Sequence, residues 1–181
     1  MGSQITDSQR IEKDEQLAGD AAVAKVRELL PSFKAAIFVT GVKSGHGLHS
    51  RPLAIQGDPS TFGGTLWFFA DDRSPKVYEL AVDTAVSLFM QNDSATHYLQ
   101  LDGTASLSRE TSKMRELYTP MVKTWFPDGL EDPHLTLIRF DAKSGAFWES
   151  PGGAWQVAAA LATSLITGKP GKSGKSGLLS F

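Results

Sequence analysis

One short stretch of the sequence, residues 68–76, has the residue types of an anion-binding helix start. Ser74 and Pro75 are preferred at the N-cap and the first position of a helix, so a helix is expected to begin there. The free N–H groups and the dipole of a helix N-terminus favour a bound anion. Lys76 places a cation in the first turn, where it is unfavourable for the bare helix, and an anionic ligand would remove that conflict.

Arg51 supplies a second cation from a different part of the chain. If the predicted strands at residues 48–56 and 65–70 pair symmetrically about the loop between them, Arg51 lies opposite Ala70. Its guanidinium then reaches the space above Ser74 and Lys76, where arginine offers phosphate a bidentate fork and lysine a point charge. Residue chemistry alone leaves a second interpretation open, in which Ser74 only caps a helix and both cations are surface residues.

The elements that must position these residues are short. Branched and aromatic residues bounded by glycine-containing turns predict strands at 36–40, 48–56, 65–70, 85–90 and 98–107, and a closing hairpin at 135–140 and 145–148. Apolar spacing predicts helices at 8–30, 74–82, 111–125 and 155–166. Residues 168–177, rich in Gly, Lys and Ser, are expected to be mobile. Short strands with few helices favour a small barrel over a doubly wound sheet.

Composition narrows the possible classes of function. A net charge of −2 gives no broad attraction to nucleic acid or to an acidic membrane, and neither partner is expected. The absence of cysteine excludes disulfides, thiolate catalysis and zinc–thiolate sites. Residues 1–15 have no apolar signal core, and no apolar run approaches the ~20 residues of a membrane span. A cytoplasmic location is therefore expected.

Several other residues could in principle bind a ligand or act in catalysis, but they are assigned no site. Two Gly-Lys-Ser repeats at residues 171–176 lack the earlier glycine and the preceding strand of a phosphate-binding P-loop. His46 and His49 are close in sequence, but the other histidines are scattered, and no metal is predicted. Asp71 and Asp72 are expected to point apart as solvated loop residues rather than to act as an acid–base pair.

Five short motifs follow one another in an order known from one family. They are Ser50-Arg51-Pro52-Leu53, Leu66-Trp67-Phe68-Phe69, Ser74-Pro75-Lys76, Trp125-Phe126-Pro127-Asp128-Gly129 and Phe147-Trp148-Glu149-Ser150-Pro151. The first three resemble the pyridoxamine 5′-phosphate oxidase-like family of flavin-binding split barrels, and the last two resemble its general stress protein subgroup. The resemblance implies a mainly β (α+β) fold, a six- to seven-stranded antiparallel split β-barrel with flanking short helices. This flavin-binding domain would span residues 23–151, after an N-terminal extension and helix (1–22) and before a C-terminal helix and flexible tail (152–181).

The resemblance also assigns roles to residues. It implies that the flavin phosphate binds Arg51, Ser74 and Lys76, and that backbone at four further positions and a strand tyrosine contact the ring. Because the family builds its site at a homodimer interface, two tryptophans would reach the partner's flavin or serve in packing. The expected cofactor-binding residues are Arg51, Pro52, Leu53, Phe69, Ala70, Ser74, Pro75, Lys76, Tyr98, Trp125 and Trp148.

The function implied by the resemblance is that of an FMN-binding flavoprotein resembling the general stress proteins, an oxidoreductase acting on a small molecule. No catalytic acid or base is assigned, because the flavin carries the electron chemistry. The alternatives are a non-catalytic module that binds or sequesters flavin, a split barrel that uses FAD, deazaflavin or haem, and a scaffold without a ligand. Authentic pyridoxamine phosphate oxidases use arginines near the C-terminus. The last arginine here is Arg139, so that activity is not expected.

Overall fold

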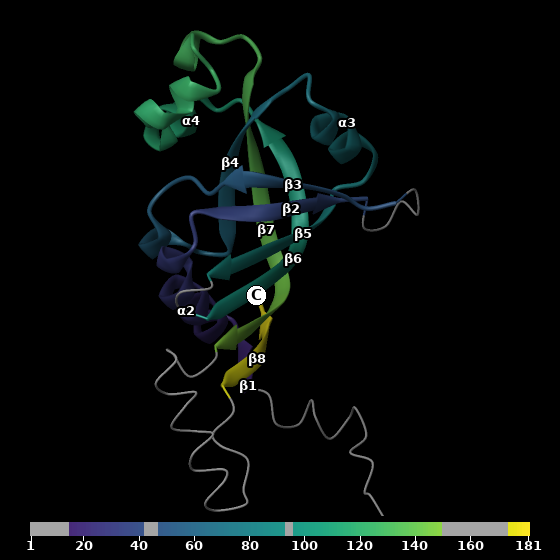
Figure 1. Cartoon of the computed structure of the whole chain (residues 1–181), viewed down its shortest axis with the longest axis vertical. Coiled ribbons are helices and arrows are strands. Elements are labelled where there is room, and N and C mark those ends of the chain that lie inside the picture. The colour runs from purple at the N-terminus through teal and green to yellow at the C-terminus, as the bar shows by residue number, and fades with distance from the viewer. Residues whose placement is uncertain (1–14, 42–46, 93–95, 150–173) are drawn as a thin grey trace, which may run out of the picture.

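A computed structural model describes residues 15–41, 47–92, 96–149 and 174–181 of the chain (Figure 1). The strands are β1 (Glu15–Ala18), β2 (Ala35–Thr40), β3 (His49–Ala54), β4 (Thr65–Asp71), β5 (Ala85–Asn92), β6 (His97–Ser108), β7 (Leu135–Glu149) and β8 (Lys175–Ser180). The α-helices are α2 (Asp20–Leu29), α3 (Pro75–Val82) and α4 (Thr111–Leu117). Four 3₁₀ turns complete the elements of these ranges: η1 (Leu30–Ser32), η2 (Pro59–Thr61), η3 (Pro120–Thr124) and η4 (Gly129–Glu131).

The strands form one mixed sheet with the order β1-β8-β7-β6-β5-β2-β3, and β4 pairs with β7 off this path. The long strand β7 pairs with β6 on one side and with β4 and then β8 on the other. A bulge at Asp102 and Gly103 shifts the register between β6 and β7 midway. The prediction of a mainly β fold is confirmed. Within the described residues the sheet has eight strands, does not close, and contains one parallel pair, β1 with β8.

The inner face of the sheet forms the main core. Four phenylalanines of this core are fully buried, and Phe38 meets Phe68 edge to face with ring centroids 5.6 Å apart. Helix α2 covers part of this face (Figure 1) with Ala22, Val26 and Leu29, which recur at helical spacing. These contacts give the sheet a rigid interior that holds the strand ends in place.

A second apolar cluster lies on the other face of β4. Strand β4 alternates, so Leu66, Phe68 and Ala70 enter the main core while Trp67 and Phe69 pack against the second cluster. That cluster contains Met114 and Leu117 of α4, Val122 of η3, and Leu135 and Leu137 of β7. Burial on both faces explains why β4 reads as an almost continuous apolar run. The exit of β4, where the predicted anion site begins, is thus held from both sides.

The helix predicted at residues 8–30 is wrong at residues 15–18, and its residues 8–14 lie outside the described part of the chain. Residues 15–18 form β1, and α2 begins only after Gly19, whose φ of +55° lies in the left-handed region that glycine adopts easily. The Gly19 N–H donates to the carbonyl of Ser180 at 2.8 Å. Parallel pairing with β8 therefore satisfies this backbone, and no local pattern in residues 15–18 reports a partner about 160 residues away.

The tail expected to be mobile at residues 168–177 is also wrong in its described part. From Lys175 the chain forms β8, which lies between β7 and β1. A Cβ on Gly177 would lie 2.4 Å from the Glu15 carbonyl oxygen and 2.6 Å from the Phe147 ring. Glycine is thus required here for close packing rather than for flexibility. The helix predicted at residues 155–166 lies outside the described residues.

Two further elements differ from the sequence prediction. The hairpin expected at 135–140 and 145–148 is the single strand β7, and β6 pairs with it from Leu137 to Glu149. The helix expected at 111–125 ends at Leu117, and Pro120 then opens the separate turn η3. Among the helices of the described ranges, none combines the length and the apolar character needed to cross a membrane.

Candidate functional site

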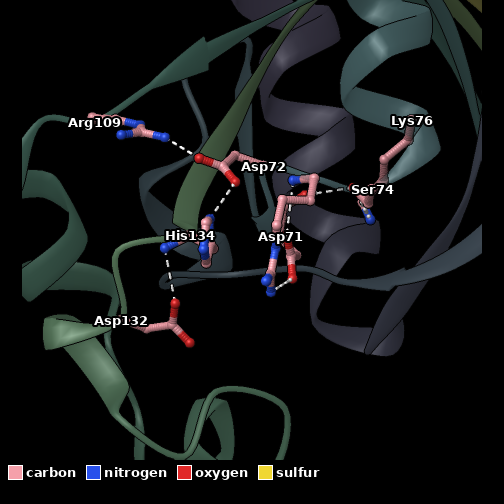
Figure 2. A network of polar contacts seen from close by, with 8 residues as sticks. Asp71, Asp72, Ser74, Lys76, Arg109, Asp132 and His134 are labelled. Carbon is pink, nitrogen blue, oxygen red and sulfur yellow. Dashed lines mark hydrogen bonds and ion pairs between the residues drawn. The ribbon is translucent and has the colours of Figure 1, made fainter.

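The start of α3 is formed as the Ser-Pro-Lys motif predicts. Pro75 is the first helical residue, and Ser74 precedes it in an extended conformation. The Ser74 hydroxyl does not cap the helix, however; it donates to the carbonyl oxygen of Asp71 at 2.5 Å. The same hydroxyl oxygen accepts a hydrogen bond from Lys76 Nζ at 2.9 Å. Ser74 therefore holds the Lys76 ammonium beside the first turn of the helix (Figure 2).

Arg51 is fixed above α3 by two hydrogen bonds. Its Nη1 donates to Thr40 Oγ1 and its Nη2 to Glu79 Oε2, each at 2.8 Å. Thr40 is fully buried, and the Arg51 and Glu79 side chains are each 22% exposed. A guanidinium held in this way loses little further freedom when it binds a ligand.

The predicted register that placed Arg51 near the site is wrong. Arg51 lies opposite Phe38 of β2, not opposite Ala70, because β3 pairs with β2 while β4 pairs with β7. The convergence with Lys76 arises instead through α3. Glu79 lies three residues after Lys76, on the same side of the helix, and contacts Arg51.

Lys76 is half-buried beside another cation. Burial, and then the positive charge of Arg51, lower the pKa of Lys76, and Asp71 and Glu79 offset this only in part. Arg51 and Lys76 carry two positive charges, and Glu79, which contacts Arg51, offsets one of them, while Asp71 is itself paired with Arg73. The guanidinium and the ammonium together form a donor set that suits an anionic ligand with several acceptor oxygens.

Glu79 and His49 belong to this site, although sequence reasoning missed both. The Glu79 carboxylate accepts from Thr40, from Arg51, and from His49 Nδ1 at 2.7 Å. Burial opposes ionisation of Glu79, but these hydrogen bonds outweigh it and hold the pKa of Glu79 below its ordinary value. Two spacings in the sequence could have indicated these residues. Glu79 follows Lys76 by three residues on a helix, and His49 precedes Arg51 by two residues on a strand.

The turn between β4 and α3 carries a network of ion pairs (Figure 2). Asp71 and Asp72 point to different partners: Asp71 pairs with Arg73 at 2.7 Å, and Asp72 pairs with Arg109 and with His134 at 3.0 Å. Hydrogen bonds from Arg73 lower the pKa of Asp71 to about 2. One ligand atom from each of Asp71, Asp72 and His134 lies within 4.8 Å of the others, yet an arginine engages each carboxylate. The geometry therefore favours a bridging network over a bound cation.

A second group of predicted residues lies on the outer face of the sheet. Tyr98 and Trp148 are directly opposite each other on β6 and β7, and both are partly exposed. They line an open hollow of about 640 Å³ together with Ile37 and Phe89. Arg51 lies directly opposite the buried Phe38, so both side chains point to the same face of the sheet. This is the face opposite the hollow. One chain accordingly presents its cations and its exposed aromatic residues on different faces.

Comparison with known proteins identifies the family. The model of the family described as pyridoxamine 5′-phosphate oxidase like matches residues 21–171. The chain belongs to this family.

Several relatives agree with this assignment. A general stress protein 26 from Jannaschia sp. CCS1 superposes with a TM-score of 0.74 and 21% identity, over 87% of this chain and 97% of that chain. The general stress FMN/FAD binding protein of Xanthomonas citri superposes with a TM-score of 0.62 and 22% identity, over 74% and 92% of the two chains. Protein bli-3 of Neurospora crassa is 26% identical over 165 residues, which are 87% of this chain and 78% of that protein. At sequence identities this low, the structural similarity shows that the proteins share a fold.

The other residues predicted to bind the cofactor lie apart from one another in this family member. Pro52 is exposed on the outer face, beside Ile37, while Leu53 packs against the main core. Phe69 packs against the second cluster and is partly buried, and the Ala70 side chain is buried. Trp125 is 79% exposed at the end of η3. The structure thus gathers Arg51, Ser74, Pro75 and Lys76 in one place and Tyr98 and Trp148 in another.

Proposed function

We propose that the protein binds FMN, with the flavin phosphate held by Arg51, Ser74 and Lys76. The observation that carries this proposal is the pair of cations at the start of α3, where half-buried Lys76 lies near Arg51. A phosphate monoester ends in two negative charges and offers several acceptor oxygens, which suits one guanidinium, one ammonium and one hydroxyl. The Xanthomonas citri relative, described as an FMN/FAD binding protein, supports a flavin. FAD is the alternative cofactor.

We further propose that the complete site belongs to a homodimer. Five large apolar side chains are exposed on the outer face of β2, β5, β6, β7 and β8: Ile37, Phe89, Tyr98, Trp148 and Leu178. Contiguous exposed apolar side chains of this kind are a feature of interaction surfaces. A second copy on this face would bury it and would bring Tyr98 and Trp148 towards the flavin of its partner.

The proposed activity is that of an oxidoreductase acting on a small organic molecule. A bound flavin supplies one- and two-electron transfer. The residues of this chain would bind the phosphate, orient the ring and, through the paired outer faces, exclude water from it. No side chain of the chain is proposed as a catalytic acid or base. A flavin-binding stress module without turnover is the second candidate, and it uses the same phosphate site.

The cofactor itself provides the test. The purified protein is expected to be yellow and to release FMN on denaturation, identified by mass. Release of FAD would replace the FMN assignment, and a colourless protein that takes up neither flavin would refute the proposal. Bleaching by NADPH followed by reoxidation with an added acceptor supports an oxidoreductase; a flavin that no donor reduces supports the binding module. No conversion of pyridoxamine 5′-phosphate is expected.

A further inference from the structure

The turn that carries Ser74 and Lys76 is anchored at Asp72. The Asp72 N–H donates to the carbonyl oxygen of His134 at 2.9 Å. One oxygen of its carboxylate accepts from His134 Nδ1 at 3.0 Å, and the other accepts from Arg109 Nη2. The Asp72 side chain is 21% exposed, so these contacts are partly shielded from water.

The two anchoring partners come from two different strand ends. Arg109 directly follows β6, and His134 directly precedes β7. The His134 N–H in turn donates to Asp132 Oδ1 at 2.8 Å, which fixes the backbone at the start of β7. A single carboxylate therefore ties the turn after β4 to both of these strands (Figure 2).

The connection from Asp72 to the anion site passes through one peptide. The carbonyl group of Asp71, which forms the peptide with Asp72, accepts from the Ser74 hydroxyl at 2.5 Å and from the Ser74 N–H at 3.0 Å. Ser74 then accepts from Lys76 Nζ. In Figure 2 the Asp72 carboxylate points towards Arg109 and His134 and away from Lys76. Any effect of Asp72 that is carried by contacts therefore passes through the turn.

We propose that Asp72, clamped by Arg109 and His134, is a positioning residue that sets Ser74 and Lys76 for the flavin phosphate. This inference rests on the proposed flavin site. It adds a residue on the far side of the turn that controls affinity without touching the ligand.

A double-mutant cycle tests the inference with FMN as the probe, measured by quenching of flavin fluorescence on the purified full chain. Asp72→Asn should weaken FMN binding about threefold to tenfold. In a Lys76→Met background the same change should cost less than about twofold, because the cation that Asp72 positions through Ser74 is already gone. Riboflavin, which has no phosphate, should bind Asp72→Asn and the unaltered protein equally.

Three further measurements complete the test. Asp20→Asn removes the same charge from an exposed position in α2 and should leave FMN affinity unchanged. Arg109→Ala should match Asp72→Asn, Arg109→Lys should retain more of the affinity, and both remain usable if Asp72→Asn does not fold. Unchanged FMN affinity in Asp72→Asn and Arg109→Ala, or an equal loss with and without Lys76, overturns the positioning role. If Lys76→Met alone leaves the FMN affinity unchanged, the assignment of the phosphate site itself is wrong.

Discussion

Replacing Lys76 with methionine removes a charge from the proposed phosphate site and keeps most of the side-chain volume. A hydrogen bond to a charged group contributes roughly 1.5–3 kcal/mol, whereas an exposed ion pair contributes about 0–1 kcal/mol. Lys76 is half-buried, so the expected loss lies near the lower end of the first range, about tenfold in FMN affinity.

Replacing Arg51 with alanine should cost more than replacing Lys76. Without Arg51, the Glu79 carboxylate loses its 2.8 Å ion pair and keeps only its contacts with Thr40 and His49, so its negative charge lies beside the phosphate without the guanidinium between them. The expected loss lies at the upper end of the same range, roughly a hundredfold. The structure therefore ranks the two variants, with Arg51→Ala the weaker binder.

The assay compares FMN with riboflavin at constant ionic strength, because the ratio of the two affinities isolates the phosphate. Both variants should lower this ratio, and Lys175→Met should leave it unchanged. Lys175 is exposed on β8, at the end of the sheet opposite α3 (Figure 1). A ratio that stays the same in Arg51→Ala and Lys76→Met would refute the phosphate assignment.

Three other outcomes follow from the structure. Because burial and Arg51 lower the pKa of Lys76, FMN affinity should fall as the pH rises through that pKa, earlier than for an ordinary lysine. Lys76→Arg should abolish this alkaline loss in an FMN titration against pH, and an identical loss in both proteins would contradict the electrostatics. If the protein forms the proposed dimer, analytical ultracentrifugation should show monomers for Ile37→Asp and a dimer for Val82→Asp, which lies at an exposed site on α3; a dimer in both variants excludes the outer face as the interface. Phe38→Ala should lower the free energy of unfolding in urea by about 3–5 kcal/mol, and the exposed Tyr78→Ala by less than about 0.5 kcal/mol; a similar small loss in both would contradict the core assignment.

Local signals were sufficient for most of the elements. Branched and aromatic runs mark β2, β4 and β5 to within two residues at each end, and the Ser-Pro pair marks the start of α3. These features depend on residues within a few positions of one another, which is the range over which backbone preferences act. The second cluster was predictable in part from the apolar residues of α4.

Pairing between distant strands was not predictable from local signals. The wrong partner for β3 followed from assuming that neighbouring strands in sequence pair with each other, whereas β4 pairs with β7. Gly177 was interpreted as a sign of flexibility, but it is required where β8 lies against β1 and Phe147. In both cases the deciding contact joins residues far apart in the sequence.

The residues of the candidate site also fall into those that local sequence signals predicted and those that they did not. Arg51, Ser74 and Lys76 were identifiable because a helix start and two cations have a known use in anion binding. Glu79 was not, because its role depends on Arg51 crossing over α3. Asp72 was not, because its partners arrive from the ends of β6 and β7.

A crystal structure of the chain with bound FMN tests the central claim most directly. The phosphate is expected within hydrogen-bond distance, about 2.7–3.2 Å, of the Arg51 guanidinium, Ser74 Oγ and Lys76 Nζ. A phosphate bound elsewhere, with these three side chains in contact only with protein and solvent, would contradict it.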